Sequence, residues 1–223
     1  MAPPPFERAV AYGPYEGRMR DAIHALKYDR LHAAARGLGL KLAVAIAQLA
    51  SDAPAAMLVV PVPLHRSKSA DRGFNQARLL AEEALTFLHK WYPAWQLTLE
   101  PSMLRRIRST ESQAGLTPHQ RRLNVRGAFG VSDPAAVQGK HVLIVDDILT
   151  TGATARSAAR ALLQAGAETV CVATLARAYR LHPARFNSAA SLVDVAGDNT
   201  SHGNTPRPHP QQASMHSQNQ PSF

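Results

Sequence analysis

The sequence has few of the features that direct a protein out of the cytoplasm or into a membrane. It holds a single cysteine, Cys171, which excludes an intramolecular disulfide; this residue lies in an apolar run and is predicted to be buried. No apolar run approaches the roughly 20 residues that a membrane-spanning helix needs. Residues 1–5, Met-Ala-Pro-Pro-Pro, lack the basic and apolar regions of a signal peptide. We therefore expect a soluble, cytoplasmic protein without a membrane span.

Acidic and aromatic residues are also scarce. Lys and Arg number 25 against 16 Asp and Glu, giving a formal charge of +9, and aromatic residues make up 6% of the chain. From residue 178 onward the net charge is +1, so +8 belongs to residues 1–177. The positive electrostatic field of so basic a domain attracts anions, whether pyrophosphate or nucleic acid. The most basic stretch, 104–129, contains only Phe129 as a stacking aromatic, which argues against a single-strand nucleic-acid site there.

The most informative segment joins an apolar run to two acids and a small-residue loop. Residues 142–145 have the composition of a buried strand and lead directly into Asp146 and Asp147. The loop residues are Thr150, Thr151, Gly152, Ala153 and Thr154, and an alanine-rich helical stretch follows. A loop that opens onto a helix N-terminus suits a phosphate, whereas adjacent carboxylates suit ribose hydroxyls or Mg²⁺. This order predicts a sugar-phosphate site at the end of a parallel strand; a buried strand leading into an N-capped helix is the simpler alternative.

This segment resembles the thirteen-residue signature of the type I phosphoribosyltransferases. The resemblance implies that Asp146 and Asp147 bind the ribose 2′- and 3′-hydroxyls of phosphoribosyl pyrophosphate and hold Mg²⁺ as the cofactor. It also implies that the loop residues 150–154 wrap the 5′-phosphate. Other phosphate motifs fit less well, because a P-loop needs a Lys-Ser/Thr pair and a Rossmann turn needs glycines directly after the strand.

A second strand-and-loop segment narrows the family. Residues 57–66 read M-L-V-V-P-V-P-L-H-R, and the loop ends in R-G-F-N-Q at 72–76. This resembles the signature of the ComF/GntX group, which are competence-protein-F-like members of the same superfamily. In the wider superfamily the loop after this strand binds pyrophosphate, which implies ligand-binding roles for His65, Arg66 and Arg72. The basic residues suit a polyanion, although a solvated basic loop would also account for them.

The third segment, Leu104 to Phe129, contains six arginines and one glutamate. It resembles the R-x-R-x-T-x-S-Q…G-A-F run of the same group, at the place where type I enzymes have a long flexible loop that closes over the active site. Loops of this length without periodicity are usually functional or disordered. As a lid, it would use Arg106 or Arg108 as catalytic residues that stabilise the departing pyrophosphate. A solvated arm is the alternative.

Strand and helix patterns alternate through the rest of the chain. The expected strands are 57–62, 97–100, 141–146 and 169–175, and the expected helices are 74–88 and 153–165, the last ended by Gly166. This rhythm predicts an α/β fold, a parallel sheet of the type I phosphoribosyltransferase form with helices on both faces. Helices at 17–28 and 38–50 are expected to form a small N-terminal hood or flank. Residues 1–177 would form the phosphoribosyltransferase-like domain, and 178–223 a disordered polar tail.

Two departures from the family pattern limit what the resemblance implies. ComF-like proteins usually begin with a four-cysteine zinc ribbon, which Cys171 alone cannot form. Either the chain lacks that module or its start is set too late. Thr150 stands where purine-salvage members often carry an acidic general base, and a threonine cannot take that role near neutral pH, so base salvage by that route is not expected.

Two functions remain open at this point. The first is an enzyme that binds phosphoribosyl pyrophosphate with Mg²⁺ and transfers ribose 5-phosphate to an unidentified acceptor. The second is a non-catalytic competence accessory protein that binds single-stranded DNA or competence proteins of the DNA-uptake machinery. The oligomeric state is open as well, and a homodimer is one option.

Overall fold

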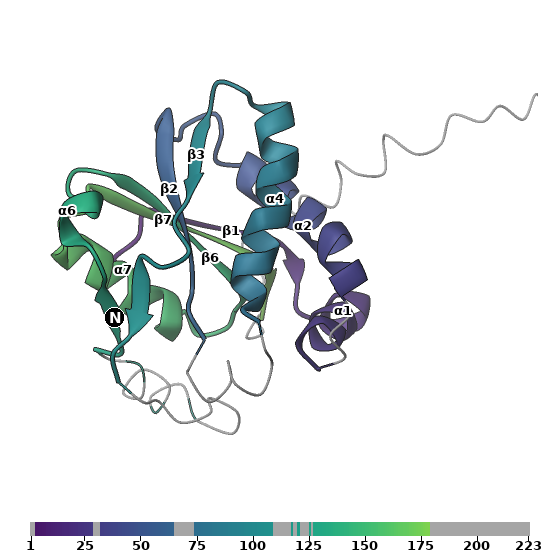
Figure 1. Ribbon diagram of the computed structural model, residues 1–223. Helices are drawn as coiled ribbons and strands as arrows, with labels where there is room; N and C mark the ends of the chain where they lie inside the picture. Colours follow the sequence, from purple (N-terminus) through teal and green to yellow (C-terminus); the bar gives the residue numbers. More distant parts are fainter. Residues whose placement is uncertain are drawn as a thin grey trace, which may run out of the picture.

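The structure is a computed structural model that describes residues 3–28, 32–64, 74–108, 117, 120, 125 and 127–178. These residues are organised around a five-stranded sheet with the strand order β1-β7-β6-β2-β3 (Figure 1). Its strands are β1 (Arg8–Pro14), β2 (Ala56–Pro61), β3 (Gln96–Leu99), β6 (His141–Leu149) and β7 (Thr169–Arg177). All neighbouring strands are parallel, so their carboxyl ends meet at one edge of the sheet, where open α/β sheets bind ligands.

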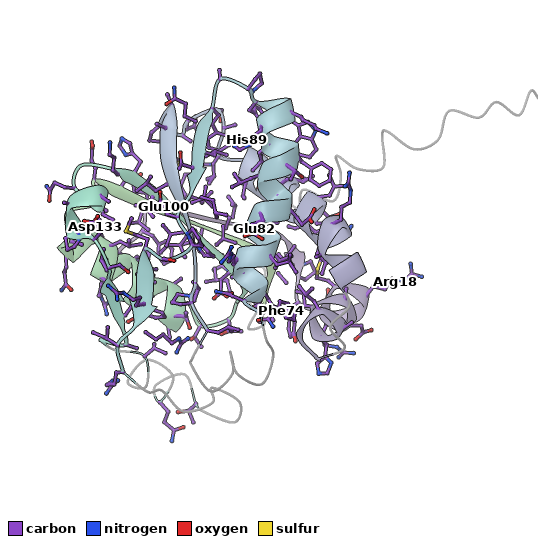
Figure 2. The ribbon with its side chains drawn as sticks, viewed as in Figure 1. Arg18, Phe74, Glu82, His89, Glu100 and Asp133 are labelled. Atoms are coloured by element: carbon purple, nitrogen blue, oxygen red, sulfur yellow. The ribbon has the colours of Figure 1, made fainter. Side chains whose placement is uncertain are left out.

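Helices cover both faces of the sheet, and side chains fill the space on both sides (Figures 1 and 2). On one face α2 (His32–Ala47) packs against α4 (Gln76–Trp91), with α1 (Gly17–Tyr28) beside α2. On the other face lie α7 (Ala153–Gln164) and the short α6 (Pro134–Val137). Alternate residues of β6 supply the two cores: Leu143 and Val145 face α2 and α4, and Val142 and Ile144 face α7.

A separate two-stranded sheet lies on the α7 face. It pairs β4 (Leu104–Arg106) with β5 (Phe129–Val131) in antiparallel register, with Arg106 opposite Phe129. The two ends of the stretch predicted to be a long loop therefore form a hairpin. The middle of that stretch lies outside the described residues, apart from 107, 108, 117, 120, 125, 127 and 128.

The predicted fold class is confirmed, and the structure adds elements that the sequence patterns do not indicate. The expected strands and helices all appear, with some ends as predicted and the others shifted by up to six residues. β6 continues to Leu149, so the prediction that this strand ends at the two acids is wrong. β1, β4, β5 and α6 were not anticipated. The N-terminal helices α1 and α2 flank the sheet on the α4 face, where Leu42 and Ile46 are fully buried.

Two local predictions concern α7 and β7. Gly166 has a φ of +98° and ends α7. Its N–H donates to the Leu163 carbonyl at 3.0 Å, and the N–H of Ala167 donates to the Leu162 carbonyl at 3.0 Å, as in a Schellman motif. Cys171 is buried in β7 as predicted, and burial raises the pKa of its thiol, with the negative charge of Glu7 adding to the effect.

Two further predictions concern the membrane and the C-terminus. None of the helices in the described part of the chain has the length and apolar character of a membrane span. The tail predicted for 178–223 lies outside the described residues, apart from Ala178.

Candidate sugar-phosphate site

The strand β6 is kinked at the two predicted acids. Up to Val145 its side chains alternate between the two cores, but Ile148 packs on the α2 and α4 side and Leu149 on the α7 side, so the alternation has slipped by one residue. The pairing of β6 with β7 skips Asp147, whose backbone N–H donates to Oδ1 of Asp146 at 2.9 Å. The carboxylate of Asp146 thus satisfies a donor at the kink, and the strand resumes beyond it.

The loop after this kink leads into a helix that begins without a side-chain cap. Gly152 is the N-cap residue of α7, in the left-handed region at φ 71° and ψ 10°, where glycine is favoured. It has no side chain to accept from the first turn, and that turn carries no acidic residue. The hydroxyl of Thr151 accepts a long hydrogen bond from the Ala153 N–H, at 3.4 Å. The start of α7 therefore offers backbone donors and the positive end of the helix dipole to an anion.

The predicted phosphate loop and the predicted acids therefore share one short connection. Thr150 is exposed, Ala153 is buried, and the other members are half-buried, as are both acids: Thr151, Gly152, Thr154, Asp146 and Asp147. Half-buried carboxylates and hydroxyls at a strand end remain accessible to a ligand while the backbone beneath them is fixed. The structure brings these seven residues together in one site.

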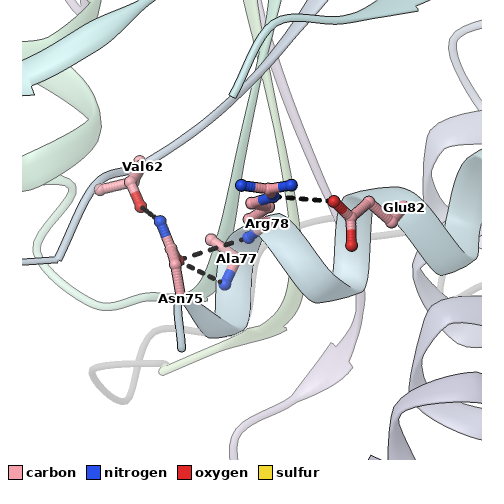
Figure 3. A network of polar contacts seen from close by, with 5 residues as sticks. All are labelled: Val62, Asn75, Ala77, Arg78 and Glu82. Atoms are coloured by element: carbon pink, nitrogen blue, oxygen red, sulfur yellow. Dashed lines mark hydrogen bonds and ion pairs between the residues drawn. The ribbon is translucent and has the colours of Figure 1, made fainter. Parts of the chain in front are cut away.

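Asn75, a residue that the sequence patterns leave without a role, links the end of β2 to the start of α4. Its Oδ1 accepts from the N–H groups of Ala77 at 3.0 Å and Arg78 at 3.4 Å, which caps α4. Its Nδ2 donates to the carbonyl of Val62 at 3.1 Å, so the same side chain also holds the end of β2 (Figure 3). His65, Arg66 and Arg72, to which ligand-binding roles were assigned, lie outside the described residues.

Arg106 and Arg108, the two predicted lid arginines, have different surroundings. Arg106 is half-buried on β4: its Nε donates to the carbonyl of Pro63 at 3.1 Å, and its guanidinium lies over the ring of Phe129, 5.0 Å from the centroid. Burial lowers the pKa of Arg106 from its ordinary value, and the negative charge of Asp146 opposes that shift. Arg108, two residues beyond β4, is exposed.

Comparison with known proteins decides the family. A model of the phosphoribosyl transferase domain matches residues 80–194 and so includes β6, the loop and α7. The chain is a ComF-like member of the type I phosphoribosyltransferase family. It is 35% identical over 178 residues to a protein of Escherichia coli O6:H1 named DNA utilization protein YhgH, covering 78% of this chain and 74% of that protein.

Two further relatives carry competence names. Competence protein F of Haemophilus influenzae is 30% identical over 178 residues, covering 78% of this chain and 75% of the relative. Competence protein ComFC of Bacillus subtilis is 34% identical over 109 residues, covering 49% of this chain and 39% of the relative. The ComF-like assignment therefore extends beyond the matched domain to most of the chain.

The donor set of this candidate site fits a magnesium ion that binds together with a phosphorylated ligand. Among the described residues, no group of three or more His, Cys, Asp or Glu side chains could hold a metal. Mg²⁺, however, commonly binds through one or two carboxylates together with substrate phosphates and water. Asp146 and Asp147 offer that number of hard oxygen ligands, so they fit a cation that arrives with a phosphorylated ligand.

Three groups near the carboxyl edge of the sheet were not predicted from the sequence: Asn75, the carbonyl of Pro63 and the ring of Phe129. An asparagine directly before a helical pattern is a recognised N-cap signal, so the cap made by Asn75 could have been found. Its bond to Val62, and the contacts of Arg106 with Pro63 and Phe129, join segments distant in sequence. No local pattern encodes them.

Proposed function

We propose that the chain binds phosphoribosyl pyrophosphate with Mg²⁺ at the β6–α7 connection and transfers ribose 5-phosphate to an acceptor still to be identified. The observation that carries the proposal is the succession, along one strand and the loop after it, of two half-buried carboxylates and a helix start whose N-cap residue, Gly152, supplies no side-chain acceptor. The first group suits vicinal sugar hydroxyls and the second suits a phosphate dianion. A sugar phosphate carries both groups within one molecule.

Each part of the site has a separate task in this proposal. The N–H groups at the start of α7, with the threonine hydroxyls of residues 150–154, hold the 5′-phosphate. Asp146 and Asp147 accept hydrogen bonds from the ribose hydroxyls and lie near a sugar that becomes electron-poor as its bond to pyrophosphate breaks. When bound, Mg²⁺ neutralises charge on the pyrophosphate. Arg108, which is exposed beyond β4, is the arginine that we assign to pyrophosphate.

Calorimetric titration of the full-length chain with phosphoribosyl pyrophosphate and Mg²⁺ tests the proposal. Asp147→Asn is expected to weaken binding at least tenfold, because hydrogen bonds to a charged group contribute about 1.5–3 kcal/mol, with unfolding unchanged. The matched control is Asp133→Asn, which makes the same substitution at the start of α6, and it should bind as the wild type does. Equal affinity in the Asp147 variant, or a folded wild type that binds nothing, would reject the proposal.

A second candidate function, binding of single-stranded nucleic acid, is favoured by an aromatic cluster on α4. Trp91 is 43% exposed and Tyr92 is 37% exposed. The rings of Phe87 and Trp91 lie 5.9 Å apart, and Arg36 lies over Phe87 at 5.7 Å. Stacking surfaces beside a cation suit unpaired bases. This cluster is at the end of α4 near His89, away from Phe74 at its start (Figure 2).

The names of the relatives, which refer to DNA utilization and competence, support this second candidate. It would place the protein in the cytoplasm, bound to single-stranded DNA or to competence proteins, as a monomer or a homodimer. Titration of the full-length chain with a labelled single-stranded oligonucleotide tests it. Trp91→Ala should weaken binding about fivefold or more, since stacking contributes about 1–3 kcal/mol per base. Asp147→Asn should bind the oligonucleotide as the wild type does.

The salt dependence provides an independent check on the second candidate. Neutralising about five single-strand phosphates gives a log–log slope of roughly −3.5. A flat salt response would count against binding of nucleic-acid phosphates. A Trp91→Ala variant that binds like the wild type would exclude the aromatic cluster as the site.

A further inference from the structure

The consecutive arginines of β4, Arg105 and Arg106, have different environments. Arg105 is exposed, and its Nε donates to Oγ of Ser132 at 2.7 Å. Arg106 is half-buried; its Nε donates to the Pro63 carbonyl, and its guanidinium lies over the Phe129 ring. Because successive side chains of a strand point to opposite sides, one guanidinium stays with its own hairpin and the other reaches the main sheet. Arg106 therefore connects the hairpin to the main sheet, which is a different role from that of a lid residue.

The contacts of Arg106 lie at the carboxyl edge of the sheet. Pro61 of β2 is paired with Val145 of β6, and the Val62 N–H donates to the Val145 carbonyl at 2.9 Å. Continued by one residue, this register places Val62 opposite Asp146. Pro63, whose carbonyl accepts from Arg106, directly follows Val62. The guanidinium thus joins the end of β2 to the ring of Phe129 on the hairpin, and the negative charge of Asp146 acts on it.

We propose that Arg106 is a positioning residue of the sugar site, which fixes the end of β2 and the carboxylate of Asp146 relative to each other and does not hold pyrophosphate. The inference rests on the proposed function of the β6–α7 site. One edge of the guanidinium is engaged by a backbone carbonyl and one face by an aromatic ring, so its orientation is set before a ligand arrives. A cation held in this orientation attracts the carboxylate of Asp146 and so limits the positions that this side chain can take.

Phosphoribosyl pyrophosphate and ribose 5-phosphate differ only in the pyrophosphate group. Comparing their affinities therefore distinguishes a positioning role of Arg106 from direct contact with pyrophosphate. The full-length chain is titrated in Mg²⁺ with phosphoribosyl pyrophosphate, and the affinity for ribose 5-phosphate is measured by displacement of the first ligand. A positioning residue acts on the part common to both ligands. We therefore expect Arg106→Gln to weaken both by the same factor, about tenfold, whereas the matched control Arg105→Gln changes neither by more than about twofold.

A second variant keeps the test decisive where Arg106→Gln lowers stability. Phe129→Leu keeps a buried apolar side chain but removes the ring beneath the guanidinium, and it should weaken both ligands in the same ratio by a smaller factor. In the double variant, Phe129→Leu should add little to Arg106→Gln, because the ring acts through the arginine. Thermal unfolding of each variant identifies any loss of affinity that comes from unfolding alone.

The remaining outcomes distinguish the failure of the two proposals. A loss confined to phosphoribosyl pyrophosphate, with ribose 5-phosphate unaffected, would assign Arg106 to the pyrophosphate and overturn the positioning role. Wild-type affinities for both ligands in Arg106→Gln would overturn it as well, with the proposed function left standing. A folded wild type that binds neither ligand would reject both proposals together.

Discussion

The helices α4 and α7 occupy equivalent places in the fold, but only α4 has a side chain that caps its first turn. Each follows the carboxyl end of a central parallel strand, β2 for α4 and β6 for α7. The first turn of α4 is closed by Asn75, whose side chain accepts from two backbone N–H groups. The first turn of α7 follows Gly152, which supplies no side-chain cap. The chain thus satisfies one helix start with its own atoms and leaves the other without a side-chain acceptor at its N-cap.

This difference separates a structural role from the binding role that we propose, at equivalent places in the fold. A cap such as Asn75 contributes about 1 kcal/mol to stability relative to alanine, whereas a glycine at the N-cap costs only a few tenths of a kcal/mol. What Gly152 provides instead is a left-handed backbone that lets the helix N-terminus approach a ligand closely. The comparison therefore predicts that substitutions at Asn75 change stability and that the α7 start responds to anions.

The largest effect on stability is expected for Asn75→Ala. The variant loses the cap of α4, about 1 kcal/mol, and the hydrogen bond to the Val62 carbonyl, about another 1 kcal/mol. The free energy of unfolding, measured by urea denaturation, should fall by about 2 kcal/mol. The midpoint should fall with little change in the slope, because the folded state keeps the same buried surface.

Asn75→Asp divides the two contributions. The aspartate keeps the oxygen that accepts from Ala77 and Arg78 but has no amide hydrogen for Val62. It should therefore lose only about half as much stability as the alanine variant. An alanine variant as stable as the wild type would show that the bridge in Figure 3 contributes nothing to the fold.

An intermediate effect is expected for Gly152→Ala. An added Cβ would meet Leu149 at 3.8 Å and Arg156 at 3.9 Å, which are ordinary contacts, so the expected loss of about 1–1.5 kcal/mol comes from the left-handed backbone. The matched control is Gly37→Ala in α2, where an added Cβ meets nothing within 4 Å. That exposed helical site should gain up to about 1 kcal/mol. Stability is measured by thermal unfolding. If Gly152→Ala and Gly37→Ala lowered it equally, the left-handed backbone of Gly152 would not be the cause of the loss.

The contrast between the two helix starts also explains how much of the molecule the sequence could predict. The acids and the loop all lie within residues 146–154, so the candidate site on β6 and α7 could be found from one short segment. The end of α7 could also be predicted locally, because the single residue Gly166 ends the helix. β1 could not be found in this way, because it is defined by pairing with β7, for example Arg8 with Cys171, and its own burial pattern does not alternate.

The continuation of β6 beyond the acids escaped prediction for a different reason. Two adjacent aspartates normally mark the end of a buried strand, because a charged side chain costs free energy in an apolar core. Here the carboxylate of Asp146 accepts from the next backbone N–H, and Ile148 and Leu149 return to the two cores. Sequence patterns indicate where apolar residues are, but they do not show that one side chain can satisfy a kinked backbone.

The smallest effect is expected at the capped start of α6, which joins those of α4 and α7 in the comparison. Asp133 accepts from the N–H groups of Ala135 at 3.1 Å and Ala136 at 3.2 Å, as Asn75 does at α4, but no bond from its side chain to another strand is seen in the described part of the chain. Asp133→Ala should therefore lose the cap alone, about 0.5–1 kcal/mol in urea denaturation, and Asp133→Asn should restore it. If Asp133→Ala lost as much stability as Asn75→Ala, the bond from Asn75 to Val62 would add nothing to its cap, and the two helix starts would differ only in whether they are capped.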